Sequence, residues 1–254
     1  MNPAASIVDR LAGLAAAPTV SLVDRVYASF VSVETPLPIG PVLVAYTDRG
    51  INYVRPAGDP EQFAAAYRDR FQQPLRMPAR APRSLTEALR TGRTAQLDYD
   101  LRGLSAFEQA VLRKALEIPR GETRPYGWIA AEIDRHRAVR AVGTALGHNP
   151  IPFLIPCHRV VRSDGTSGEY GFGPELKRQL LAAENVNLDE IHTLAGRGWL
   201  FVGSDTTGIV CYPSCRHARR VTPAHLVGFR SVNQALAAGF RPCRHCRPVV
   251  AQPA

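Results

Sequence analysis

Five cysteines are the residues of this sequence best suited to chemistry, and their spacing divides them into four and one. Cys211 and Cys215 form a C-x3-C pair, and Cys243 and Cys246 form a C-x2-C pair after 27 intervening residues. Four thiolates at such short spacings suit a tetrahedral Zn²⁺ ion. The odd number of cysteines argues against a disulfide scaffold. The sequence therefore predicts a zinc site and one free thiol, Cys157.

Cys157 follows a stiff apolar segment that holds three prolines, and it precedes His158 and Arg159. A thiol reacts as its thiolate, which neighbouring cationic or hydrogen-bonding groups favour. Adjacent residues of an extended chain point to opposite faces, so His158 can assist Cys157 only if the chain turns there or a water bridges them. A lone cysteine also suits a buried apolar position. Residue types alone leave both a nucleophile and a packed side chain open.

Helices on either side of Cys157 must position it. An S-x-x-E capping box at Ser105 and Glu108 predicts a helix start, and that helix ends before Pro119. Two further helices are predicted, from about Tyr126 to Ile133 and from Arg137 to His148. A glycine-rich stretch follows Cys157, and the next predicted helix runs from Pro174 to about Ala183, near Glu184.

The helix predicted over residues 137–148 has two distinct faces. Val139, Val142 and Leu146 form an apolar stripe, and Arg137, Arg140, Thr144 and His148 lie opposite. Two consecutive helices, the second with a basic outer face, suit a helix-turn-helix. An ordinary amphipathic surface helix stays an alternative on periodicity alone.

Outside this region the sequence predicts smaller units. Residues 1–20 suggest a short helix, residues 72–95 a connecting segment and residues 187–198 a linker. The N-terminal unit is predicted to hold strands at Val26–Val33, Pro41–Tyr46 and Gly50–Val54 and a helix at Glu61–Phe71. The Thr47-Asp-Arg-Gly50 break predicts a hairpin between the last two strands. The C-terminal unit is predicted to open with a strand at Trp199–Val202.

The string Ile155-Pro-Cys-His-Arg-Val160 resembles the signature of the O6-alkylguanine-DNA alkyltransferases. The resemblance covers about residues 105–186, including Pro125-Tyr126, the 137–143 segment, Asn149-Pro150 and the glycine pattern that precedes Glu184. It implies that Cys157 takes an alkyl group irreversibly from guanine O6, without a cofactor. It further implies that His158 deprotonates Cys157 through a water, that Glu184 orients His158, and that Asn149 shapes the turn before the cysteine.

Guanine O6 is buried in the base stack, so the resemblance also implies that the target base is extruded from the duplex. Tyr126 would act at the target nucleotide, and Arg140 would hold the space that the guanine leaves. The expected DNA contacts are Tyr126, Arg137, Arg140, Ala141 and Thr144. The expected partner is double-stranded DNA that carries alkylated bases, O4-methylthymine included, and the chain is expected to be a monomer.

Residues 202–215 and 235–246 resemble the zinc domain of the Ada DNA-repair proteins. In that family the first of four cysteines takes a methyl group from a backbone phosphotriester, which here implies Cys211. Zn²⁺ keeps the thiols ionised, and an uncharged phosphotriester repels the dianionic centre less than a phosphodiester does. A structural or DNA-docking zinc module is the alternative. The Ada zinc domain precedes a regulatory segment, whereas this one comes last, so no transcriptional switch is expected.

The composition and net charge are typical of a globular protein that binds a polyanion. Of 254 residues, 45% are apolar and 21% charged, which excludes wholesale disorder. Residues 187–254 carry eight arginines against three carboxylates, a net +5 of the total +9. No apolar run reaches the ~18–20 residues of a membrane span. Asp9 and Arg10 interrupt the only apolar N-terminal stretch, so no membrane partner and a cytoplasmic location are expected.

The predicted fold class is α+β in three parts. A small ribonuclease-like α/β domain takes residues 1–100, a helix-turn-helix, winged-helix-like alkyltransferase domain takes 101–186, and an Ada-type four-cysteine zinc domain takes 199–254.

The predicted function is single-turnover DNA repair at Cys157, with a possible second transfer to Cys211. The alternative is a non-catalytic lesion-binding or regulatory protein with a structural zinc module, which the intact Pro156–Arg159 string and Glu184 disfavour. Nothing supports the oxyanion site that a Cys-His hydrolase needs.

Overall fold

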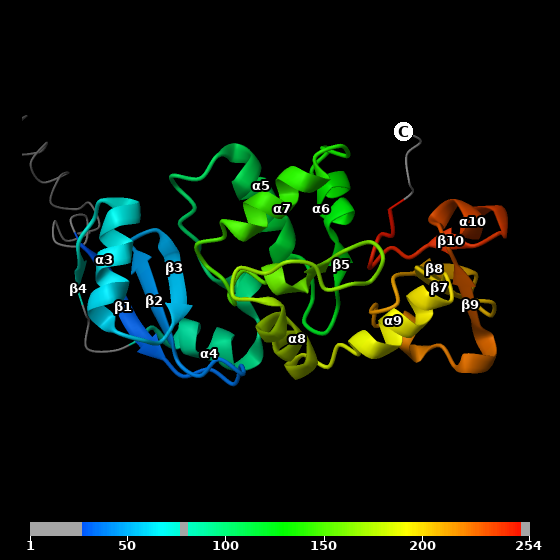
Figure 1. The fold of residues 1–254 in the computed structure, drawn as a ribbon, viewed down its shortest axis with the longest axis horizontal. Coiled ribbons are helices and arrows are strands. Elements are labelled where there is room, and N and C mark those ends of the chain that lie inside the picture. Colours follow the sequence, from blue (N-terminus) through cyan, green and yellow to red (C-terminus); the bar gives the residue numbers. More distant parts are fainter. Residues whose placement is uncertain (1–26, 77–80, 250–254) are drawn as a thin grey trace, which may run out of the picture.

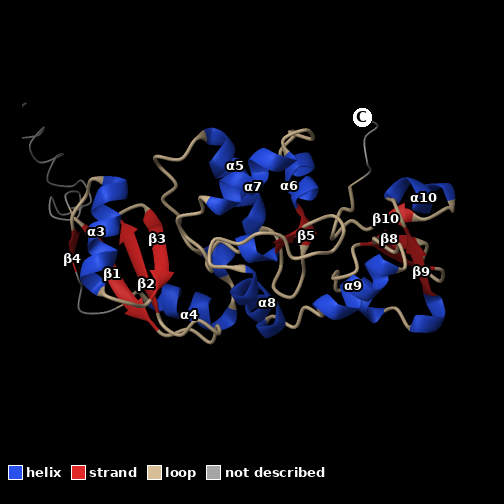
Figure 2. Cartoon of the chain, viewed as in Figure 1, coloured by secondary structure: helices blue, strands red, loops and turns tan. Residues whose placement is uncertain are grey.

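The computed structural model describes residues 27–76 and 81–249, and it arranges them in three lobes along one axis (Figure 1). Most strands lie in the two outer lobes, and helices dominate the central one (Figure 2). The helix expected within residues 1–20 lies outside the described residues. None of the described helices is long and apolar enough to cross a membrane.

The N-terminal lobe is a four-stranded sheet in the order β3-β2-β1-β4, with helix α3 (Pro60–Phe71) on one face. Alternating side chains of β1 explain the two faces: Phe30 packs with Phe63 of α3, and Val31 faces the main core. The predicted hairpin is confirmed, with the strands β1 (Ala28–Val33), β2 (Val42–Thr47), β3 (Gly50–Pro56) and β4 (Leu75–Arg76).

The prediction of a connecting segment over residues 72–95 is wrong in part. The described part of that segment contributes β4 and helix α4 (Arg83–Thr91), and a 3-10 helix follows at residues 94–96. Leu85 and Leu89 of α4 lie one turn apart and are both buried. Pro82 is the N-cap of this helix, and Arg83 and Arg90 are exposed on it.

The central lobe packs helices around the segment that holds Cys157. The predicted capping box is confirmed: the Ser105 hydroxyl accepts a hydrogen bond from the Glu108 amide, and the Glu108 carboxylate accepts one from the Ser105 amide. The strands β5 and β6 pair in parallel. The elements of the lobe are α5 (Ala106–Leu116), β5 (Arg124–Pro125), α6 (Tyr126–Glu132), α7 (Val139–Gly147), β6 (Val160–Val161) and α8 (Pro174–Ala183).

Helix α7 starts two residues later than the sequence predicts. A turn in which the Ala138 amide donates to the Arg135 carbonyl precedes it, so Arg137 lies before the helix. As the first helical residue, Val139 is 40% exposed, and the prediction that it belongs to the apolar stripe is wrong. Val142 and Leu146 are buried as expected.

The C-terminal lobe is a second four-stranded sheet in the order β10-β8-β7-β9. The predicted strand Trp199–Val202 begins instead at Phe201. The lobe comprises helix α9 (Leu188–Gly196), the strands β7 (Phe201–Ser204), β8 (Ile209–Cys211), β9 (Leu226–Phe229) and β10 (Arg241–Pro242), and helix α10 (Val232–Ala237).

Residues 187–198 were predicted to be a linker, and most of them form helix α9. The Asn187 side chain caps this helix by accepting a hydrogen bond from the Glu190 amide. Asp189 and Glu190 suit the positive N-terminal end of the helix, and Leu194 is buried. A Cβ on Gly165 of the central lobe would lie 3.0 Å from the Ile191 side chain, so α9 packs against that lobe.

Backbone pairing joins β3 to residues 98–100, the segment that leads into the central lobe. The Ile51 amide donates to the Asp98 carbonyl, and the Asp100 amide donates to the Ile51 carbonyl. A Cβ on Gly50, whose φ is +132°, would lie 2.4 Å from the Asp98 oxygen. Glycine is therefore required where these two segments meet.

Candidate active site and metal centre

Cys157 lies where the chain turns sharply after Pro156. Residues Cys157–Arg159 form a one-turn 3-10 helix, so the chain turns here, which is one of the two arrangements that would let His158 assist Cys157. The Cys157 side chain is 7% exposed and lines a cavity of about 610 Å³. Tyr126, Arg140, Arg162 and Tyr170 line the same cavity.

Asn149 holds the segment that leads to Cys157. Its Nδ2 donates to Cys157 Sγ at 3.3 Å and to the Ile155 carbonyl at 3.1 Å, and its Oδ1 accepts from the Ile151 amide at 2.9 Å. Asn149 is itself buried. One amide side chain therefore fixes both ends of the apolar segment and contacts the sulfur directly.

Glu184, at the end of α8, binds the two residues that follow Cys157. Its Oε1 lies 3.1 Å from His158 Nε2. Arg159 donates to both carboxylate oxygens at 2.8 Å, and a third Arg159 nitrogen donates to the Ile118 carbonyl at 2.7 Å. His158, Arg159 and Glu184 are all at least 95% buried, so the charges are paired where water does not screen them.

These contacts set the protonation states. Burial alone would raise the pKa of Glu184, but the hydrogen bonds from His158 and Arg159 outweigh it and lower that pKa to about 2. Burial lowers the pKa of His158, against the opposing effect of Glu184, so its ring is neutral at pH 7. With Nε2–H donating to the carboxylate, Nδ1 keeps its lone pair. Among the described residues, Nδ1 has no hydrogen-bond partner.

Lys177 and Tyr170 also surround Cys157, and the sequence analysis gave neither a role. Burial lowers the pKa of Lys177 to about 8, and the Cys157 thiolate opposes that shift. Its Nζ donates to the Val160 carbonyl at 2.6 Å. Burial raises the pKa of the Cys157 thiol, whereas Asn149 and the Lys177 charge lower it. The buried Leu180 and Leu181 follow Lys177 by three and four positions, and this spacing could have identified Lys177 as inward-facing.

The five predicted DNA contacts fall into separate places. Tyr126 and Arg140 line the cavity of Cys157. Ala141 and Thr144 are exposed on α7, where the Thr144 hydroxyl donates to the Arg140 carbonyl. Arg137 lines a different cavity, between the central and C-terminal lobes.

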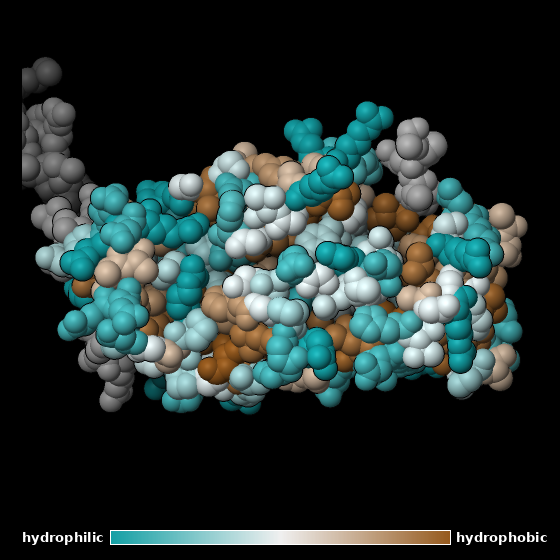
Figure 3. Space-filling view, in the orientation of Figure 1, coloured by the Kyte–Doolittle hydropathy of each residue, from teal (hydrophilic) through white to brown (hydrophobic). Residues whose placement is uncertain are grey.

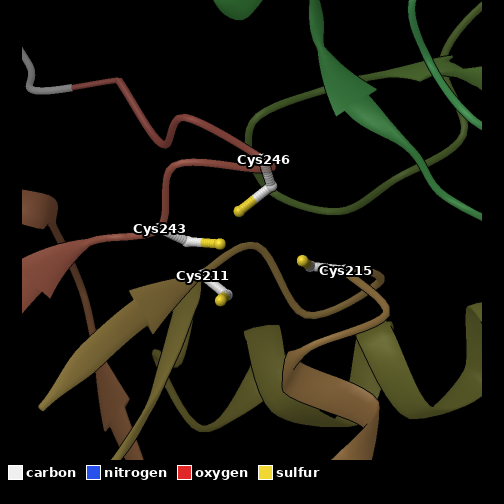
Figure 4. A group of neighbouring side chains, drawn as sticks. All are labelled: Cys211, Cys215, Cys243 and Cys246. Atoms are coloured by element: carbon white, nitrogen blue, oxygen red, sulfur yellow. The ribbon is translucent and has the colours of Figure 1, made fainter. Parts of the chain in front are cut away.

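Cys211, Cys215, Cys243 and Cys246 form a second cluster, and their sulfur atoms turn toward a common centre (Figure 4). All four are buried, and their sulfurs lie within 4.8 Å of one another. A tetrahedral Zn²⁺ with bonds of about 2.3 Å needs sulfurs ~3.8 Å apart. Four sulfurs this close cannot all be ionised without a cation between them. The cluster therefore fits zinc, and zinc would keep the thiols deprotonated there.

The zinc lobe is docked against the loop that leads into β5. The Ser214 hydroxyl accepts from the Thr123 amide at 2.9 Å and contacts the Thr123 carbonyl at 3.1 Å. The buried Glu122 carboxylate lies 2.8 Å from His245 Nε2 and 2.6 Å from the buried Arg124 guanidinium. His245 of the zinc lobe therefore contacts the central lobe.

Known proteins resemble both parts of the chain. Residues 106–186 match the family model described as 6-O-methylguanine DNA methyltransferase, DNA binding domain, and residues 194–249 match the metal binding domain of Ada. The methylated-DNA–protein-cysteine methyltransferase of Mycolicibacterium paratuberculosis is 50% identical over 88 residues, which span 35% of this chain and 53% of that protein. The chain thus spans about half the length of this mycobacterial relative.

Two further similarities extend over longer stretches. The methylated-DNA–protein-cysteine methyltransferase of Methanosarcina barkeri is 37% identical over 158 residues, which span 59% of this chain and 94% of that protein. A crystal structure of an O6-methylguanine methyltransferase variant from M. tuberculosis matches with a TM-score of 0.50 at 32% identity. That match covers 62% of this chain and 93% of the other.

The depressed pKa of Glu184 makes stability depend on pH. Because the folded value of about 2 lies below the unfolded value of about 4.3, this contribution is fully present above pH ~4.3 and is lost as the pH falls toward 2. It amounts to about 3 kcal/mol. Unfolding free energies of the wild type and Glu184→Gln, measured by denaturant titration from pH 7 to pH 2, should differ most at neutral pH. A difference that stays constant over this range would contradict the ion-pair assignment.

Metal content tests the second cluster. We expect about one zinc per chain in the wild type and in Cys157→Ser, and a large loss in Cys246→Ser, because three thiolates leave the tetrahedral site incomplete. Elemental analysis after dialysis against a weak chelator measures this. Retention of the full zinc content by Cys246→Ser would exclude the four-cysteine site.

Proposed function

The chain belongs to the methylated-DNA–protein-cysteine methyltransferase family, and we propose that it repairs DNA by single-turnover transfer of an alkyl group from guanine O6 to Cys157. The observation that carries the proposal is the placement of Cys157 on the wall of a cavity, beside a neutral histidine held by a buried carboxylate. O4-alkylthymine presents the same kind of alkylated oxygen and is proposed as a further substrate.

The proposed step exchanges the thiol proton for an alkyl group. His158 takes the Cys157 proton through a bridging water, for which its Nδ1, unpaired among the described residues, is suited. The thiolate attacks the alkyl carbon, a C–S bond forms, and the C–O6 bond breaks with its electrons left on guanine. Guanine then takes up a proton. The product is a thioether that water does not cleave, so each chain acts once.

Asn149 and Lys177 favour the thiolate that this step needs. The Asn149 amide donates to Sγ, and the positive charge of Lys177 lies near it. Both contacts oppose the effect of burial, which favours the neutral thiol. We propose that Glu184 is a positioning residue, which fixes the ring of His158 without touching the substrate.

Extrusion of the target base requires residues that enter the duplex. Tyr126 and Arg140 are suited to this role, because both line the cavity of Cys157 and Arg140 is exposed on α7. Ala141 and Thr144 are small, exposed residues of the same helix and would allow close approach to DNA. We propose double-stranded DNA as the partner of this face, and a monomer as the active unit.

We also propose a fold type for each of the three parts of the chain. Helices α6 and α7 are proposed to act as the helix-turn-helix unit of a winged-helix-like domain at residues 101–186. The sheet within residues 1–100 is proposed to be the ribonuclease-like domain, and residues 199–254 the zinc domain. No catalytic role is proposed for the N-terminal sheet.

A second transfer, from methylphosphotriesters to Cys211, is favoured by one observation. Cys211 lines a cavity of about 360 Å³, and the other three cysteines of the cluster do not line that cavity. His217, Arg220 and His225 line it as well, so polar and cationic groups face the entering backbone. The sulfur would attack the methyl carbon, and the phosphodiester would leave as an anion.

The decisive experiment for Cys157 is mass spectrometry after exposure to a duplex that carries one O6-methylguanine. The wild type should gain one methyl group on the Cys157 peptide, with a yield limited to about one per chain. Cys157→Ala should transfer none to that peptide. Its melting temperature and zinc content serve as the control for folding. Catalytic turnover by the wild type, or full transfer by Cys157→Ala, would overturn the proposal.

Cys211 is tested separately in the Cys157→Ala background. A duplex with a single backbone methylphosphotriester should place one methyl group on the Cys211 peptide, because the first site cannot compete. A duplex without the triester is the control. An unmodified Cys211 peptide would show instead that the zinc module is structural or serves only to dock DNA.

A further inference from the structure

A cavity of about 460 Å³ lies between the central and C-terminal lobes. Its volume falls within the range of small-ligand sites. Its walls come from α6, from the loop after β6, from α9 and from the zinc lobe. It is separate from the cavity of Cys157, although Arg162 lines both. On the face drawn in Figure 3, hydrophobic atoms are visible where these two lobes meet.

Aromatic rings form one side of this cavity. The indole of Trp199 lies directly over Gly228 of β9, where a Cβ would come within 1.8 Å of the ring. Glycine is therefore required under the indole, and Trp199 also lines the cavity. Phe201 and Tyr212 add two more rings, whose centroids are 5.3 Å apart.

Cationic side chains line the cavity together with these rings. Arg137, Arg162 and Arg230 line the cavity and are exposed, and no aspartate or glutamate is among its described lining residues. The Arg230 guanidinium packs over Gly198, the residue that precedes Trp199. None of the three arginines forms a salt bridge with a described residue within 4.0 Å. The charge of the cavity therefore complements an anion.

We propose that this cavity binds an unpaired nucleotide of a DNA strand, with the base against Trp199 and the flanking phosphates at Arg137, Arg162 and Arg230. Aromatic rings combined with arginines are the usual means of binding single-stranded nucleic acid, because every base has a face that stacks. Trp199 and Phe201 are half-buried at the cavity, so part of each ring is accessible. The site exists only because the zinc lobe is docked on the central lobe. It is distinct from alkyl transfer at either cysteine.

The test uses the full chain and a fluorescein-labelled oligothymidylate of about ten nucleotides without any alkyl group. Binding is measured by anisotropy at low salt. Arg230→Glu should weaken binding about tenfold or more, and the matched control Arg241→Glu, which changes the same charge on an exposed residue of β10 outside the cavity, should weaken it less than about threefold. Equal weakening by the two variants would overturn the proposal.

A second measurement locates the base. Photocrosslinking with 5-iodouracil in the oligonucleotide should modify Trp199 or Tyr212, and Trp199→Phe should keep most of the affinity because a ring remains. Zinc content and melting temperature report whether each variant is folded. Crosslinks confined to α7 would assign the strand to the helix face and exclude the cavity. Because the probe carries no transferable group, these outcomes are independent of whether Cys157 accepts alkyl groups.

Discussion

The carboxylate of Glu184 is the interaction on which the candidate active site depends. It binds His158 and Arg159 with both oxygens, and it also accepts a hydrogen bond from the Gly121 amide at 3.4 Å. It therefore joins the end of α8, the turn at Cys157 and the loop after α5. A buried carboxylate is tolerated only when its charge is matched and its oxygens are hydrogen-bonded. The guanidinium of Arg159 supplies the matching charge and two of the hydrogen bonds. The ion pair between Arg159 and Glu184 therefore fixes the carboxylate that holds the ring of His158.

The loop after α5 extends this network to the zinc lobe. Gly121 contacts Glu184, while Glu122 and Thr123, the next two residues, contact His245 and Ser214. Arg247 adds ion pairs to Glu117 and Glu132 at 2.9 Å on the exposed side. The turn of Cys157 and the four-cysteine cluster therefore rest on opposite sides of one short loop. The two sites are parts of one packed unit, in contrast to domains that a free linker separates.

The sequence allowed the local features of the fold and the chemical groups to be predicted. The capping box at Ser105, the N-terminal hairpin and the four-cysteine cluster all follow from short-range patterns, and the structure contains each of them. Features that depend on tertiary contacts could not be predicted from such patterns. Helix α9 has a single buried residue in its span, so its periodicity is weak, and its burial comes from docking between two lobes.

The same limit applies to individual side chains. Val139 fits an apolar stripe on a helical wheel, but the turn that precedes α7 leaves it 40% exposed. Arg137 belongs to the basic face by spacing, yet it faces the cavity between lobes. The sequence predicted no role for Lys177, although the buried Leu180 and Leu181, three and four positions later, mark its face of α8 as the inward one. The resemblance of the Ile155–Val160 string carried the assignment of Cys157, His158 and Glu184, and periodicity could not have supplied it.

The pairing of Glu122 with groups of the last lobe has a consequence for biosynthesis. Chains fold from the N-terminal end as they leave the ribosome, so the central helices can pack before residues 214 and 245 are available. Until then the loop at Glu122 meets water, and its carboxylate is solvated. Its full burial therefore needs the last lobe to have been synthesised, and a nascent chain that stalls before residue 245 would leave the loop at residues 121–123 exposed to water.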